Sequence, residues 1–223
     1  MRVVTSATST SDPVDSVEAE AAVASRHDVV AGPSRRYALL LVVGGLLGLT
    51  GALALTIDRI RLLEKPDTVL ECSLNSAVNC ASVMTSWQGS VFGFPNPLMG
   101  IVGFTGVVVL GCGLLGGSRY APWMWAGLGV GTLFGIGLVA WLIDQSIFSI
   151  QRLCPWCMLV WVVMVPIFVS TATFVLAEVL PSPEPVKRFA RWIGRWYALT
   201  LIVLYAVIAG LIAWKFGLTV FGA

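Results

Sequence analysis

The chain has 223 residues, of which 57% are hydrophobic and only 12% are charged, and its formal net charge at pH 7 is +2. A mean hydropathy of +0.86 excludes an ordinary soluble domain of this length, because a water-exposed surface needs far more charge. The composition therefore predicts an integral membrane protein, with no nucleic acid among its expected partners.

Residues 1–36 mix Ser, Thr, Ala, Val, Asp and Glu without apolar periodicity, which predicts a disordered cytoplasmic tail. A cleaved signal peptide is not expected, since the first apolar run begins late and is long enough to span a bilayer. Arg35 and Arg36 stand directly before that run, so the positive-inside rule predicts that the N-terminus stays in the cytoplasm.

Five uncharged stretches are each long enough to cross about 30 Å of hydrocarbon as a helix. They run approximately over Tyr37–Ile57, Pro97–Gly117, Ala121–Ile143, Leu153–Ala177 and Trp196–Trp214. Because backbone polar groups must be satisfied inside a bilayer, these stretches predict an all-α bundle. The many glycines within them predict close contacts between helices.

Alternation of the five spans places loop 58–96 outside and connector 181–195 inside. The connector is basic, as the positive-inside rule requires, although Arg59 and Arg61 in the outer loop oppose this orientation. The fifth span, within residues 196–223, then ends outside. This topology predicts that both cysteine pairs face an oxidising compartment, in which disulfides persist.

The first cysteine pair lies in the outer loop, where seven residues separate Cys72 from Cys80. That gap is too wide for a redox CxxC motif but closes easily as a loop disulfide. From Asn79 onward, the pattern predicts a short amphipathic helix that lies on the bundle mouth as a lid, with one face formed by Cys80, Val83, Met84 and Trp87. A purely structural disulfide and a four-cysteine zinc site remain open alternatives.

The second pair is Cys154-Pro155-Trp156-Cys157, which opens a long apolar helix. Proline suits the first turn of a helix, and the unpaired N–H groups there favour a thiolate. A two-residue gap lets the sulfurs exchange between dithiol and disulfide, although the same motif also forms half of a zinc site.

Three further residues outside the cysteine pairs have side chains that could react or bind a metal. Cys112 falls within the second span and is expected to pack as a small buried hydrophobic residue. Asp144, near the outer end of the third span, is a candidate for handling protons, or else faces water or pairs with Arg152. The single histidine, His27, lies in the predicted tail, so no imidazole is expected to bind haem inside the bundle.

Taken together, the motifs resemble the vitamin K epoxide reductase family over residues 37–180, the four-helix core of that family. The resemblance rests on the order and spacing of Cys72-x7-Cys80, Ser86-Trp87 with Gly89, Phe94-Pro95-Asn96, and Cys154-x2-Cys157. DsbB-type quinone-linked oxidases use a similar relay, but their CxxC motif precedes the wider pair. The order of the pairs therefore favours the first family.

The resemblance implies a four-helix transmembrane bundle around a quinone site, with a fifth transmembrane helix outside this core. It implies that Cys72 exchanges disulfides with a partner protein and that Cys80 passes electrons to Cys154. Cys157 would then face a quinone of the menaquinone or ubiquinone type. The residues expected to line the quinone pocket are Ser86, Asn96 and Trp161, the last standing where animal members carry a tyrosine.

The implied activity is that of a membrane thiol oxidoreductase that reoxidises a thioredoxin-fold, DsbA-like protein and supports disulfide formation in exported proteins. Some bacterial relatives carry a fused thioredoxin-like domain after the fifth span. This chain stops at Ala223, so the donor is expected to be a separate protein on the outer side of a bacterial inner or cell membrane. The alternative is a non-catalytic membrane protein or small transporter with a structural loop disulfide.

Overall fold

The structure is a computed structural model that describes residues 33–65, 70, 72, 73 and 77–221, with side chains as far as residue 217. The predicted disordered tail lies almost entirely outside the described residues, and so does His27. Within the described residues, the secondary structure is helical apart from one isolated bridge between two backbone segments.

Five of the helices are long and apolar enough to cross a membrane, which confirms the predicted all-α membrane fold. They are α2 (Arg35–Glu64), α4 (Pro97–Leu115), α5 (Pro122–Asp144), α6 (Pro155–Phe174) and α8 (Tyr197–Phe221). Wider π-helical turns extend α5 over Gln145–Ile150 and α6 over Val175–Val179. The shorter helices are α3 (Cys80–Thr85), a 3-10 turn at Trp87–Ser90, and α7 (Glu184–Arg195).

Two predicted segments, the outer loop and the connector, are partly helical. The first part of the predicted outer loop is helical, because α2 continues through good helix formers as far as Glu64. Lys65 then takes an extended conformation, as expected for a residue that precedes a proline. The predicted connector 181–195 is mostly helix α7, which begins after Pro183.

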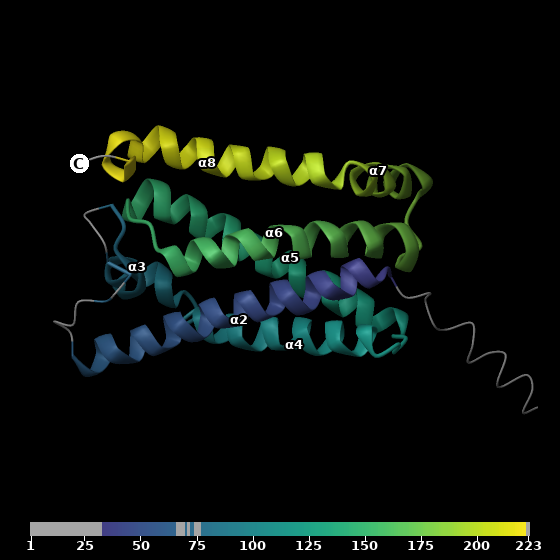
Figure 1. Ribbon diagram of the computed structural model, residues 1–223, viewed down its shortest axis with the longest axis horizontal. Helices are drawn as coiled ribbons and strands as arrows, with labels where there is room; N and C mark the ends of the chain where they lie inside the picture. The colour runs from purple at the N-terminus through teal and green to yellow at the C-terminus, as the bar shows by residue number, and fades with distance from the viewer. Residues whose placement is uncertain (1–32, 66–69, 71, 74–76, 222–223) are drawn as a thin grey trace, which may run out of the picture.

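The long helices run alternately in opposite directions, and α3 lies at the end of the bundle where α2 ends and α6 begins (Figure 1). Helix α2 packs against α4 and α6, while α5 packs against α6. Glycines on α2 permit this close approach: a side chain at Gly48 would collide with the ring of Phe104, and one at Gly45 would collide with Val108. The predicted role of glycine in helix packing is confirmed at this interface.

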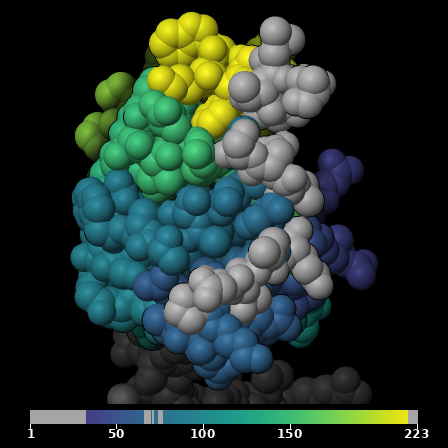
Figure 2. Space-filling model, turned by 90° about the vertical axis from the view of Figure 1, so that its left-hand side faces the viewer, coloured from purple at the N-terminus to yellow at the C-terminus, as the bar shows by residue number. Residues whose placement is uncertain are grey.

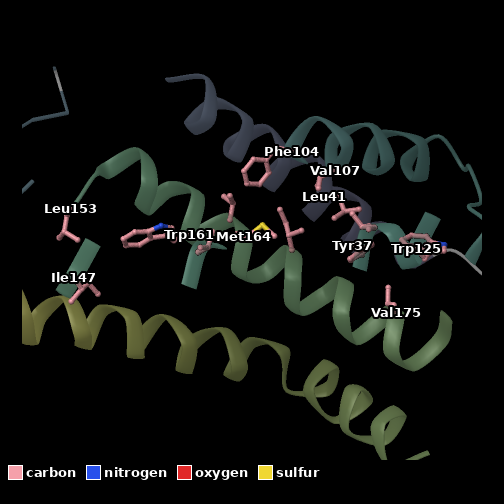
Figure 3. Packing of buried hydrophobic residues seen from close by; sticks show 14 of the residues in the cluster. Tyr37, Leu41, Phe104, Val107, Trp125, Ile147, Leu153, Trp161, Met164 and Val175 are labelled. Carbon is pink, nitrogen blue, oxygen red and sulfur yellow. The ribbon is translucent and has the colours of Figure 1, made fainter. Parts of the chain in front are cut away.

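Buried apolar side chains line the interior along the length of α6 (Figure 3). Leu41 from α2, Phe104 from α4 and Met164 from α6 belong to this cluster. Near the opposite end from α3, the Tyr37 hydroxyl and the Thr171 Oγ1 form a buried hydrogen bond of 2.8 Å. The core therefore holds α2, α4 and α6 together by apolar packing with one internal polar link.

The fifth long helix attaches to the core where a proline interrupts α6. Pro166 has no N–H, so the carbonyl of Val162 loses its usual helical donor. The Tyr205 hydroxyl of α8 donates a hydrogen bond of 2.6 Å to this carbonyl, and the Tyr197 hydroxyl donates one of 3.4 Å to the carbonyl of Pro166. Neighbouring helices in membranes commonly satisfy backbone groups that a proline leaves free.

Candidate functional site

A short backbone bridge joins the cysteine loop to the start of α6. The Leu153 N–H donates a hydrogen bond of 2.8 Å to the Ala77 carbonyl, and the Asn79 N–H donates one of 2.9 Å to the Leu153 carbonyl. Ala77 and Leu153 are both buried, so water does not compete for these bonds. The bridge fixes Cys80 and Cys154 relative to one another, because each follows a bonded residue directly along the chain.

The predicted lid helix is present as α3 and covers this junction. Asn79 caps the helix, because its side-chain oxygen accepts a hydrogen bond of 3.0 Å from the Ser82 N–H. Cys80, Val83 and Met84 are buried, as the spacing predicted. Trp87 is the exception: it is 67% exposed, because α3 ends at Thr85 and the chain turns before reaching it.

Both cysteine pairs contribute to one buried cluster at this end of the bundle. Cys72 and Cys80 form a disulfide with a Cα–Cα distance of 5.8 Å, whereas Cys154 and Cys157 are free thiols. Cys80 is 0% exposed and Cys154 only 1% exposed, and both belong to a cluster with Leu55 of α2. Figure 2 looks onto this end of the molecule, where the blue-to-teal loop segment covers much of the surface.

The CxxC motif opens α6, as predicted. Cys154 is the N-cap residue, and its Sγ accepts a hydrogen bond of 3.5 Å from the Cys157 N–H. A hydrogen bond with the Cys157 thiol lowers the pKa of the Cys154 thiol, although burial opposes this effect. Backbone N–H groups of Cys157 and Trp156 lower the pKa further, whereas the negative charge of Asp58 raises it. The net result favours a thiolate at Cys154.

An apolar cavity of about 540 Å³ extends from the redox cluster into the bundle, lined chiefly by α4 and α5. Cys157 and Trp161 line it from α6, and Asn96 lines it from the turn before α4. Glycines make part of this space. A side chain built at Gly106 or Gly131 would meet no atom within 4 Å, so these glycines leave open cavity space and do not contact a neighbouring helix.

Arg59 is the one charged side chain among the described residues that line the cavity. Its Nε is buried and has no hydrogen-bond partner within the described part of the protein. A buried donor without an acceptor is costly. In the sequence, Arg59 stands out only as a charge that opposes the predicted orientation. A lone arginine after an apolar span is common, so the sequence held no signal of this role.

The three predicted pocket residues occupy different places. Asn96 is buried at the cavity wall: its Nδ2 donates to the Gln88 carbonyl at 2.7 Å, and its Oδ1 accepts from the Val91 N–H at 3.2 Å. These bonds anchor the loop and leave the second amide proton for a ligand. Trp161 is a buried wall residue. Ser86 is not among the lining residues, and its hydroxyl donates to the Val83 carbonyl at 2.7 Å.

Cys112 and Asp144 lie outside the cavity, and the structure shows where each side chain is located. Cys112 is exposed on α4, so the prediction that it packs as a buried hydrophobic residue was wrong. It falls on the side of α4 turned away from the bundle interior. Asp144 is exposed at the end of α5, and its carboxylate accepts a hydrogen bond of 3.0 Å from the neighbouring Gln145 side chain.

The geometry suits thiol–disulfide exchange beside an apolar ligand site. A family model described as the vitamin K epoxide reductase family matches residues 39–172, which is more than half of the chain. The matched range contains both cysteine pairs and the cavity residues Asn96 and Trp161. No curated protein matches the chain.

Proposed function

Since the chain belongs to the vitamin K epoxide reductase family, a family of membrane redox enzymes, we propose that it is a quinone-linked thiol oxidoreductase. It reoxidises a separate DsbA-like, thioredoxin-fold protein on the extracytoplasmic side of a bacterial cell membrane, and so supports disulfide formation in exported proteins. One observation carries the proposal: a loop disulfide and a reduced CxxC motif share a buried cluster, and Cys157 of that motif lines an apolar cavity.

The first part of the relay takes place in the loop. A thiolate of the partner attacks Cys72, the Cys72–Cys80 bond breaks, and Cys80 leaves with the electron pair. A second thiolate of the partner attacks the mixed disulfide and closes the partner's own disulfide. The partner has then lost two electrons, and the loop pair has gained them.

The second part moves these electrons to the cavity. The Cys80 thiolate attacks Cys154 in its oxidised state, and the Cys154–Cys157 bond breaks with Cys157 leaving. Cys72 then loses its proton and attacks the sulfur of Cys80, and Cys154 leaves, which restores the loop disulfide and leaves the CxxC motif reduced. In this structure the loop pair is bonded, and the two cysteines of the CxxC motif are not.

The residues around the cavity fit a quinone. When bound, a quinone accepts two electrons and two protons. The apolar walls suit its ring and tail, the buried Nε of Arg59 can donate to a carbonyl oxygen, and Asn96 has one amide proton left to donate. Cys157 holds the reducing sulfur at the same wall, and the covering lid of Val83 and Met84 keeps water out.

A Cys80→Ser variant tests the relay against the alternative of a structural loop disulfide. The variant lacks the thiol that releases partner-bound Cys72, so a reducible adduct between the chain and its partner should accumulate on a non-reducing gel. Cys112→Ser is the matched control and should form no more adduct than the unmodified chain. If the Cys80→Ser variant forms no adduct with a DsbA-like partner present, the relay is wrong.

A further inference from the structure

Asp58 lies against the outer disulfide, although nothing in its sequence context connects it with redox chemistry. It sits in the penultimate turn of α2, with a side chain only 15% exposed. Its Oδ2 is 3.7 Å from the Sγ of Cys72. Its negative charge also raises the pKa of the Cys154 thiol.

The contact between Asp58 and Cys72 can become a hydrogen bond when the loop pair is reduced. A disulfide sulfur has no proton to donate, whereas a Cys72 thiol at this distance can donate one to the Asp58 carboxylate. A thiolate at Cys72 would instead place a second negative charge against the carboxylate, which is unfavourable in a partly buried site. Both effects keep the proton on Cys72.

We propose that Asp58 holds the proton of the reduced Cys72 thiol, so that Cys80 is the thiolate of the loop pair; this rests on the proposed relay. The partner's first thiolate attacks Cys72, and Cys80 leaves as a thiolate. The partner's second thiol loses its proton and attacks in turn, and Cys72 leaves and takes up one proton. The protonated Cys72 is a poor nucleophile toward the oxidised partner, while the Cys80 thiolate is ready to attack Cys154.

Other charged groups lie around this contact in the described part of the chain. Arg61 lies 3.7 Å from the Oδ1 of Asp58, but its side chain is 59% exposed and its charge is screened by water. From the turn before α6, Arg152 donates to the Gln151 carbonyl. The titratable groups of α6 at this end are the two CxxC thiols, and Arg59 is one of the residues that line the cavity.

The test measures how fast each cysteine reacts with iodoacetamide in the full-length, fully reduced chain, with labelled peptides quantified by mass spectrometry. In a Cys80→Ser background, Asp58→Asn should raise the labelling rate of Cys72 at pH 7 about tenfold, because the carboxylate no longer opposes the negative charge of a thiolate. Asp58→Glu keeps the carboxylate and should stay within about twofold of the parent rate. Glu64→Gln removes an exposed carboxylate from the same helix and should change nothing.

An unchanged Cys72 rate in Asp58→Asn overturns the proposal and leaves the relay standing, because the measurement needs neither partner nor quinone. A cooperative thermal unfolding transition shows that a variant is folded. If Asp58→Asn unfolds, the pH profile of the Cys80→Ser chain decides. Labelling of Cys72 should then rise at a higher pH in the folded Cys80→Ser chain than in the same chain unfolded in urea, and coincident rises overturn the proposal.

Discussion

Replacing Arg59 by methionine should weaken quinone binding while leaving the empty protein as stable as before, or more stable. The reason is that Arg59 lines the cavity and that its buried Nε has no acceptor within the described part of the protein. A buried donor without a partner costs about 1–3 kcal/mol, so its removal relieves a cost in the absence of ligand. Methionine is flexible and unbranched, and it fills the vacated space without a new polar group.

The effect on binding follows from the hydrogen bond that Arg59 offers to a quinone oxygen. A hydrogen bond from a charged group contributes about 1.5–3 kcal/mol, and each 1.4 kcal/mol is a tenfold change in Kd. Quinone binding should therefore weaken roughly 10- to 100-fold. The expected signature is a loss of affinity combined with unchanged or higher thermal stability of the ligand-free chain.

The assay titrates the purified chain with a short-tailed quinone and follows tryptophan fluorescence, since Trp161 lines the cavity. Thermal unfolding of the same preparation is measured without quinone. Arg61→Met is the control, because it removes the same charge two residues away from a side chain that is 59% exposed. An unchanged Kd in Arg59→Met would refute the reasoning, and so would a joint loss of affinity and stability, which indicates a structural role.

Three further predictions address the fold, the cavity and the inner thiols. Tyr205→Phe removes the hydroxyl that donates to the Val162 carbonyl of α6, and it should lower the free energy of unfolding by about 1 kcal/mol. A variant as stable as the parent chain would contradict this role of Tyr205. Gly131→Leu places a side chain in open cavity space and should lower the rate of quinone reduction about tenfold or more without destabilising the fold. Gly137→Leu is the control, because Gly137 lies on the same helix but outside the cavity; it should leave the rate unchanged. Cys157→Ala removes the main hydrogen bond that lowers the pKa of the Cys154 thiol, so the pKa of Cys154 should rise. Labelling of Cys154 by iodoacetamide at pH 7 should then slow. An equal or faster rate in the folded variant argues against the role of this hydrogen bond.

Much of the site could be predicted because it depends on local patterns. Asn79 caps α3, and Cys154 caps α6 just ahead of a proline, and both arrangements follow from short-range chemistry. The burial of Val83 and Met84 follows from helical spacing. Trp87 was misplaced because the same spacing was extended beyond the end of the helix, a boundary that periodicity alone does not mark.

Residues whose role depends on the partner they face could not be assigned in this way. Glycine appears throughout the spans, yet Gly48 admits a neighbouring ring while Gly131 opens a cavity. Cys112 lies in an apolar run that is compatible with either face, and the fold turned it outward. Asp58 and Arg59 are adjacent in the sequence, but the helix directs one toward the disulfide and the other toward the cavity.

The sequence by itself determined the membrane class, the five spans and the order of the two cysteine pairs, because hydropathy, charge and spacing act over short stretches of chain. The tertiary structure alone decided which side chains meet at the redox cluster and which surround the cavity. These contacts join α2, α3 and α6 across long sequence separations. They depend on the rotation and depth of each helix in the bundle, which packing between helices sets.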